Sequence, residues 1–201
     1  MLNAYPLQLP KLSQELSDVL FKLADSYDLD QGWDPSTFCS KEDYSSWNNY
    51  HSKTNTTGCI YKSFDLTEDL QQAIKQEMTD ELFPFSKLEF YFQIVAGGDA
   101  LCPHVDVGRI LNIMYNISDD GATTKFYNKL IDDNKRYIFT EHELSPSIET
   151  HQFESYQWYI FNNQMTHGVT NVTKKRIAVA ASIPYQYKSF YDYYLGTLIV
   201  N

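Results

Sequence analysis

The spacing of apolar residues changes once along the chain, and this change limits the folds open to it. Before Pro84, apolar residues recur at helical spacing from Lys11 to about Ser26 and again from Leu66 to about Glu81. Asp65 and Glu68 resemble the capping box that opens a helix. After Pro84 the apolar residues alternate with other residues, as is typical of strands. The sequence therefore predicts helices first and strands afterwards.

At least six strands are predicted in this second part, at residues 87–95, 109–117, 123–127, 136–140, 155–161 and 176–183. Helices followed by a run of strands indicate helices packed on an antiparallel sandwich or barrel, and not a parallel α/β fold. We therefore expect a mainly β protein with N-terminal helices packed on the sheet.

Length and charge narrow the class of protein. A chain of 201 residues fits one domain. It carries 16 Lys and Arg against 26 Asp and Glu, a formal net charge of −10, which argues against a surface that binds nucleic-acid phosphates. Three cysteines at unrelated spacings suggest neither a disulfide framework nor a cysteine zinc site. With no apparent signal peptide or membrane span, we expect a cytoplasmic protein.

A candidate pair of metal ligands, His104 and Asp106, precedes the strand predicted at 109–117. In extended backbone, side chains two residues apart point to the same face, so the two can converge on one ion. The pair is weak evidence alone, because a histidine at a strand edge beside a solvated aspartate gives the same pattern. His142 and His151 are other possible donors, but their surroundings offer no matching geometry.

A third ligand and a candidate anion-binding residue occur later in the chain. His167 follows an apolar strand, and two histidines with one carboxylate leave positions open on an Fe(II) ion. Arg176, nine residues further on, opens the apolar stretch "IAVAASI", where a buried guanidinium would require an anion. The alternative is that Arg176 belongs to a solvated cluster with Lys174 and Lys175.

The combined pattern resembles a known family. The order His104-x-Asp106, His167 and Arg176, with "RILNIMYNIS" after the first pair and "FNNQMTHGV" around the distal histidine, resembles the Fe(II)- and 2-oxoglutarate-dependent dioxygenases, particularly their prolyl-hydroxylase-like branch. The resemblance covers roughly residues 88–183. It implies a double-stranded β-helix, a cupin-like jelly roll, with residues 1–85 as helical and loop support, 87–183 as the core and 184–201 as an aromatic tail.

The resemblance also implies roles for individual residues. His104, Asp106 and His167 would be the iron ligands, and Arg176 would hold the distal carboxylate of 2-oxoglutarate. Ala178 occupies a place where the family often has a hydroxyl or small residue. One departure is "DDGATTKFYN" (119–128), where the family usually has a Gly-Gly-Glu-Leu type of turn.

The strand predicted at 109–117 offers two choices for a further contact to 2-oxoglutarate. Some relatives place a tyrosine here, and Tyr115 looks like that residue. Alternation, however, puts Tyr115 on a uniformly apolar face and puts Asn112 and Asn116 on the mixed face that better suits a barrel interior. We therefore favour Asn112 and Asn116 as the contacts.

The implied reaction consumes O2 and 2-oxoglutarate and releases succinate and CO2. Related halogenases have a small residue in place of the carboxylate ligand, so Asp106 favours hydroxylation, or demethylation through hydroxylation. The expected substrate is a peptide, an amino acid or another small molecule. Trp33, Trp47 and Tyr50 are candidate walls of the entrance, although ordinary packing of these loops on the sheet is the favoured alternative. Two alternatives stay open: a non-catalytic jelly roll that binds a metal or ligand, and a nucleic-acid demethylase, which the acidic charge disfavours.

Overall fold

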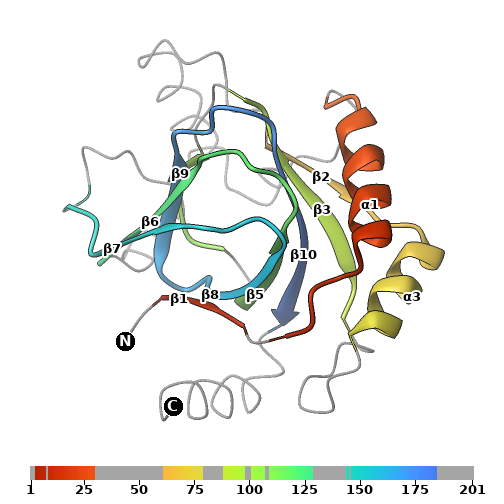
Figure 1. Ribbon diagram of the computed structural model, residues 1–201. Coiled ribbons are helices and arrows are strands. Elements are labelled where there is room, and N and C mark those ends of the chain that lie inside the picture. The colour runs from red at the N-terminus through yellow and green to blue at the C-terminus, as the bar shows by residue number, and fades with distance from the viewer. Residues whose placement is uncertain are drawn as a thin grey trace.

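The computed structural model describes residues 3–7, 9–29, 61–78, 88–97, 101–106, 109–128, 144 and 146–184 (Figure 1). Several predictions from the sequence lie outside these residues: the aromatic loop at 30–58, the strand at 136–140, His142, and the tail beyond Pro184. None of the described helices is long and apolar enough to cross a membrane.

Both predicted helices are present, in shorter form. Helix α1 spans Gln14–Ser26, and the Ser13 side chain caps it by accepting a hydrogen bond from the backbone N–H of Leu16. Helix α3 spans Glu68–Glu77 with Thr67 as its N-cap residue. The predicted capping box at Asp65 is wrong, because Asp65 is the last residue of a strand and pairs with Tyr91 of its neighbour.

The strands form two antiparallel sheets. The major sheet has the order β1 (Ala4–Pro6), β8 (Gln157–Asn162), β5 (Arg109–Asn116), β10 (Arg176–Pro184), β3 (Phe90–Val95) and β2 (Tyr61–Asp65). The minor sheet has the order β4 (Leu101–His104), β9 (Thr166–Thr170), β6 (Thr123–Tyr127) and β7 (Glu149–Gln152). The sequence predicted β3, β5, β6, β8 and β10, and missed β1, β2, β4, β7 and β9.

The helices pack on the outer face of the major sheet, as Figure 1 shows for α1 and α3 beside β3 and β10. Every second residue of β10 enters this outer core, at Ile177, Val179 and Ala181, together with Leu20 of α1 and Ile74 of α3. All five are fully buried. The prediction of a mainly β protein with N-terminal helices packed on the sheet is confirmed.

The inner face of the major sheet carries the alternate residues and faces the minor sheet. The apolar cluster here is small, with Met114, Phe126 and Ala178 at its centre. Polar and charged side chains such as Asn112 and Arg176 share this face. The space between the sheets therefore holds a pocket as well as a packed core.

Candidate metal and carboxylate site

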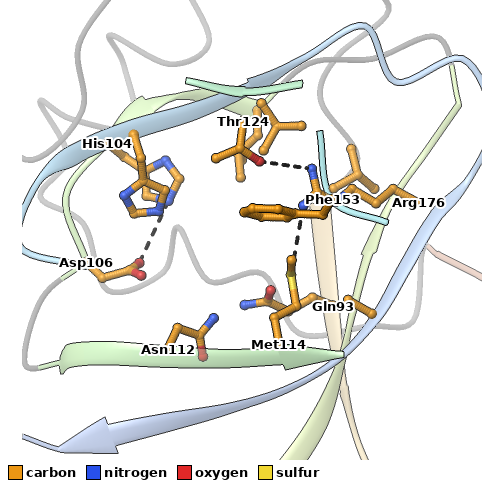
Figure 2. Close-up of a pocket in the computed structure, with 13 residues that line it drawn as sticks. Gln93, His104, Asp106, Asn112, Met114, Thr124, Phe153 and Arg176 are labelled. Atoms are coloured by element: carbon orange, nitrogen blue, oxygen red, sulfur yellow. Dashed lines mark hydrogen bonds and ion pairs between the residues drawn. The ribbon is translucent and has the colours of Figure 1, made fainter. Parts of the chain in front are cut away.

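A pocket opens between the two sheets, with a volume of about 520 Å³ that includes its open mouth. Its lining comes from strands of both sheets and from the segments that follow them: Gln93, Val95, Leu101, His104, Asp106, Asn112, Met114, Thr124, Phe153, His167, Val169, Arg176 and Ala178. Figure 2 shows His104 and Asp106 at one end of the pocket and Arg176 at the other.

Three potential metal ligands meet at one end. His104 is the last residue of β4 and pairs in register with His167 of β9, which brings their ring centroids to 4.5 Å. Asp106 lies two residues further on, with its Oδ1 atom 3.8 Å from Nε2 of His104. One ligand atom from each residue lies within 4.8 Å of the others. Ligands about 2.1 Å from a shared ion stand about 3 Å apart, so small side-chain movements would complete such a site.

Backbone contacts orient two of these ligands. Nδ1 of His167 lies 2.9 Å from the carbonyl oxygen of Met165. A proton on Nδ1 donates to this oxygen, which leaves Nε2 unprotonated as a metal ligand. The backbone N–H of Asp106 donates to the carbonyl oxygen of Asn163 at 3.2 Å. The turn between β8 and β9 therefore helps to position ligands that come from two segments of the chain.

Arg176 is buried at the opposite end, with 6% of its surface exposed. Nη1 donates to Oγ1 of Thr124 at 3.4 Å, and Nη2 lies 3.8 Å from the sulfur of Met114. The guanidinium carbon is 5.5 Å from the centre of the Phe153 ring. The alternative of a solvated basic cluster does not hold for Arg176, although it suits Lys174, which is exposed.

The other residues considered as contacts to 2-oxoglutarate lie in different places in the structure. Asn112 lines the pocket, is fully buried, and has no hydrogen-bond partner for its amide group among the described residues. Asn116 does not line the pocket, because its amide donates to the carbonyl oxygens of Ser118, at 3.0 Å, and Phe153, at 3.3 Å. Tyr115 packs in the outer core on the far side of the sheet. Ala178 lines the pocket beside Met114.

Several pocket residues were missed in the sequence. Thr124 lies in "DDGATTKFYN", the segment noted only as a departure from the family pattern. Phe153 follows His151 at a spacing of two, and this alternation could have placed both on one face. His151 itself pairs with Glu149 and stacks on Phe153 with 6.0 Å between ring centroids, outside the group of metal ligands.

The residues present suit a metal ion at one end of the pocket and the carboxylate group of a bound small molecule at the other. Two histidines and one carboxylate are a donor set that leaves positions open on a first-row metal such as Fe(II). The planar fork of Arg176 matches a carboxylate at the other end. The Asn112 amide lines the same pocket and has no hydrogen-bond partner in the part of the chain that the structure describes, so it would gain one if a polar molecule filled the pocket.

Comparison with known proteins gives matches in structure and none in sequence. No family model matches the chain, and no curated protein does. A crystal structure of a Pseudomonas putida prolyl-4-hydroxylase superposes with a TM-score of 0.50 and 14% identity, over 90% of this chain and 92% of that one. The likeness shows that the chain has the jelly-roll fold.

Two structures of the Escherichia coli protein ycfD, one of them described as a ribosomal oxygenase, also match. Their TM-scores are 0.41 and 0.39 at 10% identity. Each match covers 57% of this chain, which spans only 30% and 28% of the two chains.

Proposed function

We propose that this chain is an Fe(II)- and 2-oxoglutarate-dependent dioxygenase that hydroxylates a peptide, an amino acid or another small molecule. The observation that carries the proposal is that one pocket holds both a His-His-Asp group with ligand atoms within 4.8 Å and a buried arginine. The order of these residues in the sequence and the shared fold support the same class.

The metal end of the pocket is built by His104, Asp106 and His167. The hydrogen bond from Nδ1 of His167 to the Met165 carbonyl keeps Nε2 directed at the metal position. When bound, Fe(II) with 2-oxoglutarate and O2 would supply the oxidation, in which 2-oxoglutarate becomes succinate and CO2 while one oxygen atom is placed on the substrate. The protein binds, orients and shields these molecules.

The other end of the pocket would bind the distal carboxylate of 2-oxoglutarate. Arg176 is screened from water by Met114, Phe153 and Thr124, so its charge acts at low local dielectric. A carboxylate can accept two parallel hydrogen bonds from the guanidinium. The small side chain of Ala178 leaves room for the carbon chain.

The proposal also assigns the chain to the prolyl-hydroxylase-like branch and favours a substrate other than nucleic acid. The branch rests on the residue order quoted above, and the likeness to the Pseudomonas enzyme supports the shared fold. The net charge of −10 disfavours phosphate-rich substrates.

One anaerobic titration followed by aeration tests the proposed function. Fe(II) and then 2-oxoglutarate are added to the purified chain, and a visible charge-transfer band is expected when both occupy the site. Admission of O2 should then release succinate, slowly alone and faster in the presence of the right peptide or amino acid. Screening such compounds for increased succinate release would identify the substrate.

His104→Ala should abolish both the band and succinate release, whereas Phe64→Leu, which changes a side chain of the outer core, should retain both. Absence of the band in the parent chain would refute the proposal. A band without succinate, in the presence of a broad panel of substrates, would instead favour a non-catalytic binding protein.

A further inference from the structure

Phe153 lies beside Arg176 in the pocket. It follows strand β7, lines the pocket, and lies with its ring centre 5.5 Å from the guanidinium carbon of Arg176. Figure 2 shows the ring extending into the space between the metal end and Arg176. A guanidinium over an aromatic face is attracted by the ring, most strongly where water is excluded.

Contacts from three directions hold the Phe153 ring and its backbone. The ring stacks on Tyr159, with 4.4 Å between centroids and 29° between planes, and on His151 at 6.0 Å and 29°. The Tyr159 hydroxyl accepts a hydrogen bond from the backbone N–H of Glu154 at 2.9 Å, and the Asn116 amide donates to the carbonyl oxygen of Phe153 at 3.3 Å. These contacts therefore restrict the movement of the Phe153 ring.

The position of Arg176 depends on its neighbours, because the arginine side chain is long and flexible. Oγ1 of Thr124 accepts a hydrogen bond from Nη1 at 3.4 Å, and the sulfur of Met114 lies 3.8 Å from Nη2. The Phe153 ring lies beside the guanidinium, with its centre 5.5 Å from the guanidinium carbon, and limits the room on that side. Phe153 is therefore one of the residues that position the guanidinium relative to the metal end.

We propose that Phe153 is a specificity-determining residue that sets the chain length of the dicarboxylate accepted between the metal end and Arg176. Asn116 acts through it as a positioning residue, which gives that buried amide a role other than direct contact with the cosubstrate. The inference rests on the proposed function, because it requires that a 2-oxo dicarboxylate spans this pocket.

Binding of dicarboxylates that differ by one methylene tests the inference. The Fe(II)-loaded chain is titrated anaerobically with 2-oxoglutarate and with 2-oxoadipate, and the Kd of each is measured by calorimetry and by the charge-transfer band. One methylene in a fitted pocket is discriminated by about 10–200-fold. The parent chain should therefore bind 2-oxoglutarate at least about tenfold more tightly.

Phe153→Ala should reduce this Kd ratio at least about fivefold, with Phe153→Leu intermediate. The control is Phe64→Leu, which changes an aromatic residue stacked on Tyr27 in the outer core, and should leave the ratio unchanged. Thermal unfolding checks that each variant is folded, and Phe153→Leu decides the test if the alanine variant does not fold.

Two outcomes would overturn the inference in distinguishable ways. If Fe(II) and 2-oxoglutarate bind but the ratio is the same in the parent and the Phe153 variants, or the parent does not discriminate, the role of Phe153 is refuted and the proposed function stands. If the parent chain does not bind 2-oxoglutarate at all, both are refuted.

Discussion

Arg176 and Lys175 are neighbouring cations with opposite surroundings. Lys175 makes an ion pair with Asp25 at 3.1 Å near the surface, whereas Arg176 is buried at the end of the pocket. An exposed ion pair contributes little to stability or binding, whereas a guanidinium inside a pocket attracts a bound anion more strongly because the local dielectric is low. The burial therefore points to a binding role for Arg176 only.

Substitution of the two cations should separate these roles. Arg176→Ala should weaken 2-oxoglutarate binding at least about tenfold, since hydrogen bonds to charged groups contribute about 1.5–3 kcal/mol each. Arg176→Lys should also weaken it, because the ammonium lacks the planar fork. Lys175→Ala should have no effect on the Kd measured by calorimetry, and equal effects of the two alanine variants would contradict the assignment.

Local spacing was enough to predict that some of the candidate residues lie together. The spacing of two between His104 and Asp106 predicted a shared face, and they do lie together. Alternation in β5 correctly separated Asn112, in the pocket, from Tyr115, in the outer core. It could not predict that Asn116, at the end of the strand, turns to backbone carbonyl oxygens, because those belong to segments that only the tertiary fold brings near.

At the scale of elements, the close approach of β9 to β4 places the two histidines. A Cβ atom on Gly168 would lie 3.0 Å from the carbonyl oxygen of Leu101 and 3.1 Å from the backbone nitrogen of Pro103. Both atoms belong to β4, so a side chain at Gly168 would push the strands apart. The pairing of His104 with His167 depends on this contact.

Gly168→Ala should therefore lower the free energy of unfolding by about 1–3 kcal/mol and weaken Fe(II) binding as well. Gly121→Ala is the matched control, because its φ of +68° makes the substitution costly by about 1–2 kcal/mol at a position outside the pocket lining. It should lose stability and retain Fe(II) affinity. Unfolding by denaturant and calorimetric titration measure the two quantities, and loss of Fe(II) affinity in both variants would argue against a specific role for Gly168.

The N-terminal strand β1 is attached to the minor sheet through Glu149. Its carboxylate accepts hydrogen bonds from the backbone and side-chain nitrogens of Asn3 at 2.7–2.9 Å, and it pairs with His151. Burial raises the pKa of Glu149, but the hydrogen bonds from His151 and Asn3 outweigh it and leave the pKa below its ordinary value of 4.5. The ionised form is therefore the one that the folded state favours.

Glu149→Gln should destabilise the protein at pH 7 by about 1–3 kcal/mol. Because the pKa of Glu149 is lower in the folded state, its contribution is fully present above the unfolded value and is lost as the pH falls through the folded value. The difference in the free energy of unfolding between parent and variant should consequently become smaller below about pH 4.5. Denaturant unfolding between pH 3 and 7 measures this, with exposed Glu154→Gln as control; a difference independent of pH would contradict the account.

Prediction of elements succeeded where the pattern was long and local. The strands β3, β5 and β10 alternate over six to nine residues and were recognised. The strands β4 and β9 have four and five residues, include Pro103 and Gly168, and pair with each other, and β9 also pairs with β6. Their residues carry no periodic signal, so two of the three candidate metal ligands were expected beside strands and are in fact within them.

At the scale of the whole molecule, the major sheet separates two environments. Its outer face packs against α1 and α3, and its inner face lines the pocket. The two functions of the sheet, stability and binding, thus depend on alternate residues of the same strands.

This separation predicts that outer-core substitutions change stability without changing the site. Leu20→Ala removes a fully buried side chain of α1 and should lower the free energy of unfolding by about 2–5 kcal/mol. Fe(II) and 2-oxoglutarate affinities should be unchanged at temperatures well below the Tm. A loss of affinity in the folded variant would show that the two environments are coupled.

The central claim is that His104, Asp106 and His167 hold one metal ion facing the pocket. Anaerobic calorimetric titration of Fe(II) tests it most directly, with the parent chain, the three single alanine variants and His151→Ala compared under one condition. The account predicts one Fe(II) per chain, affinity reduced at least about tenfold in each of the three ligand variants, and parental affinity in His151→Ala. Equal Fe(II) affinity in the parent and the three ligand variants would contradict it.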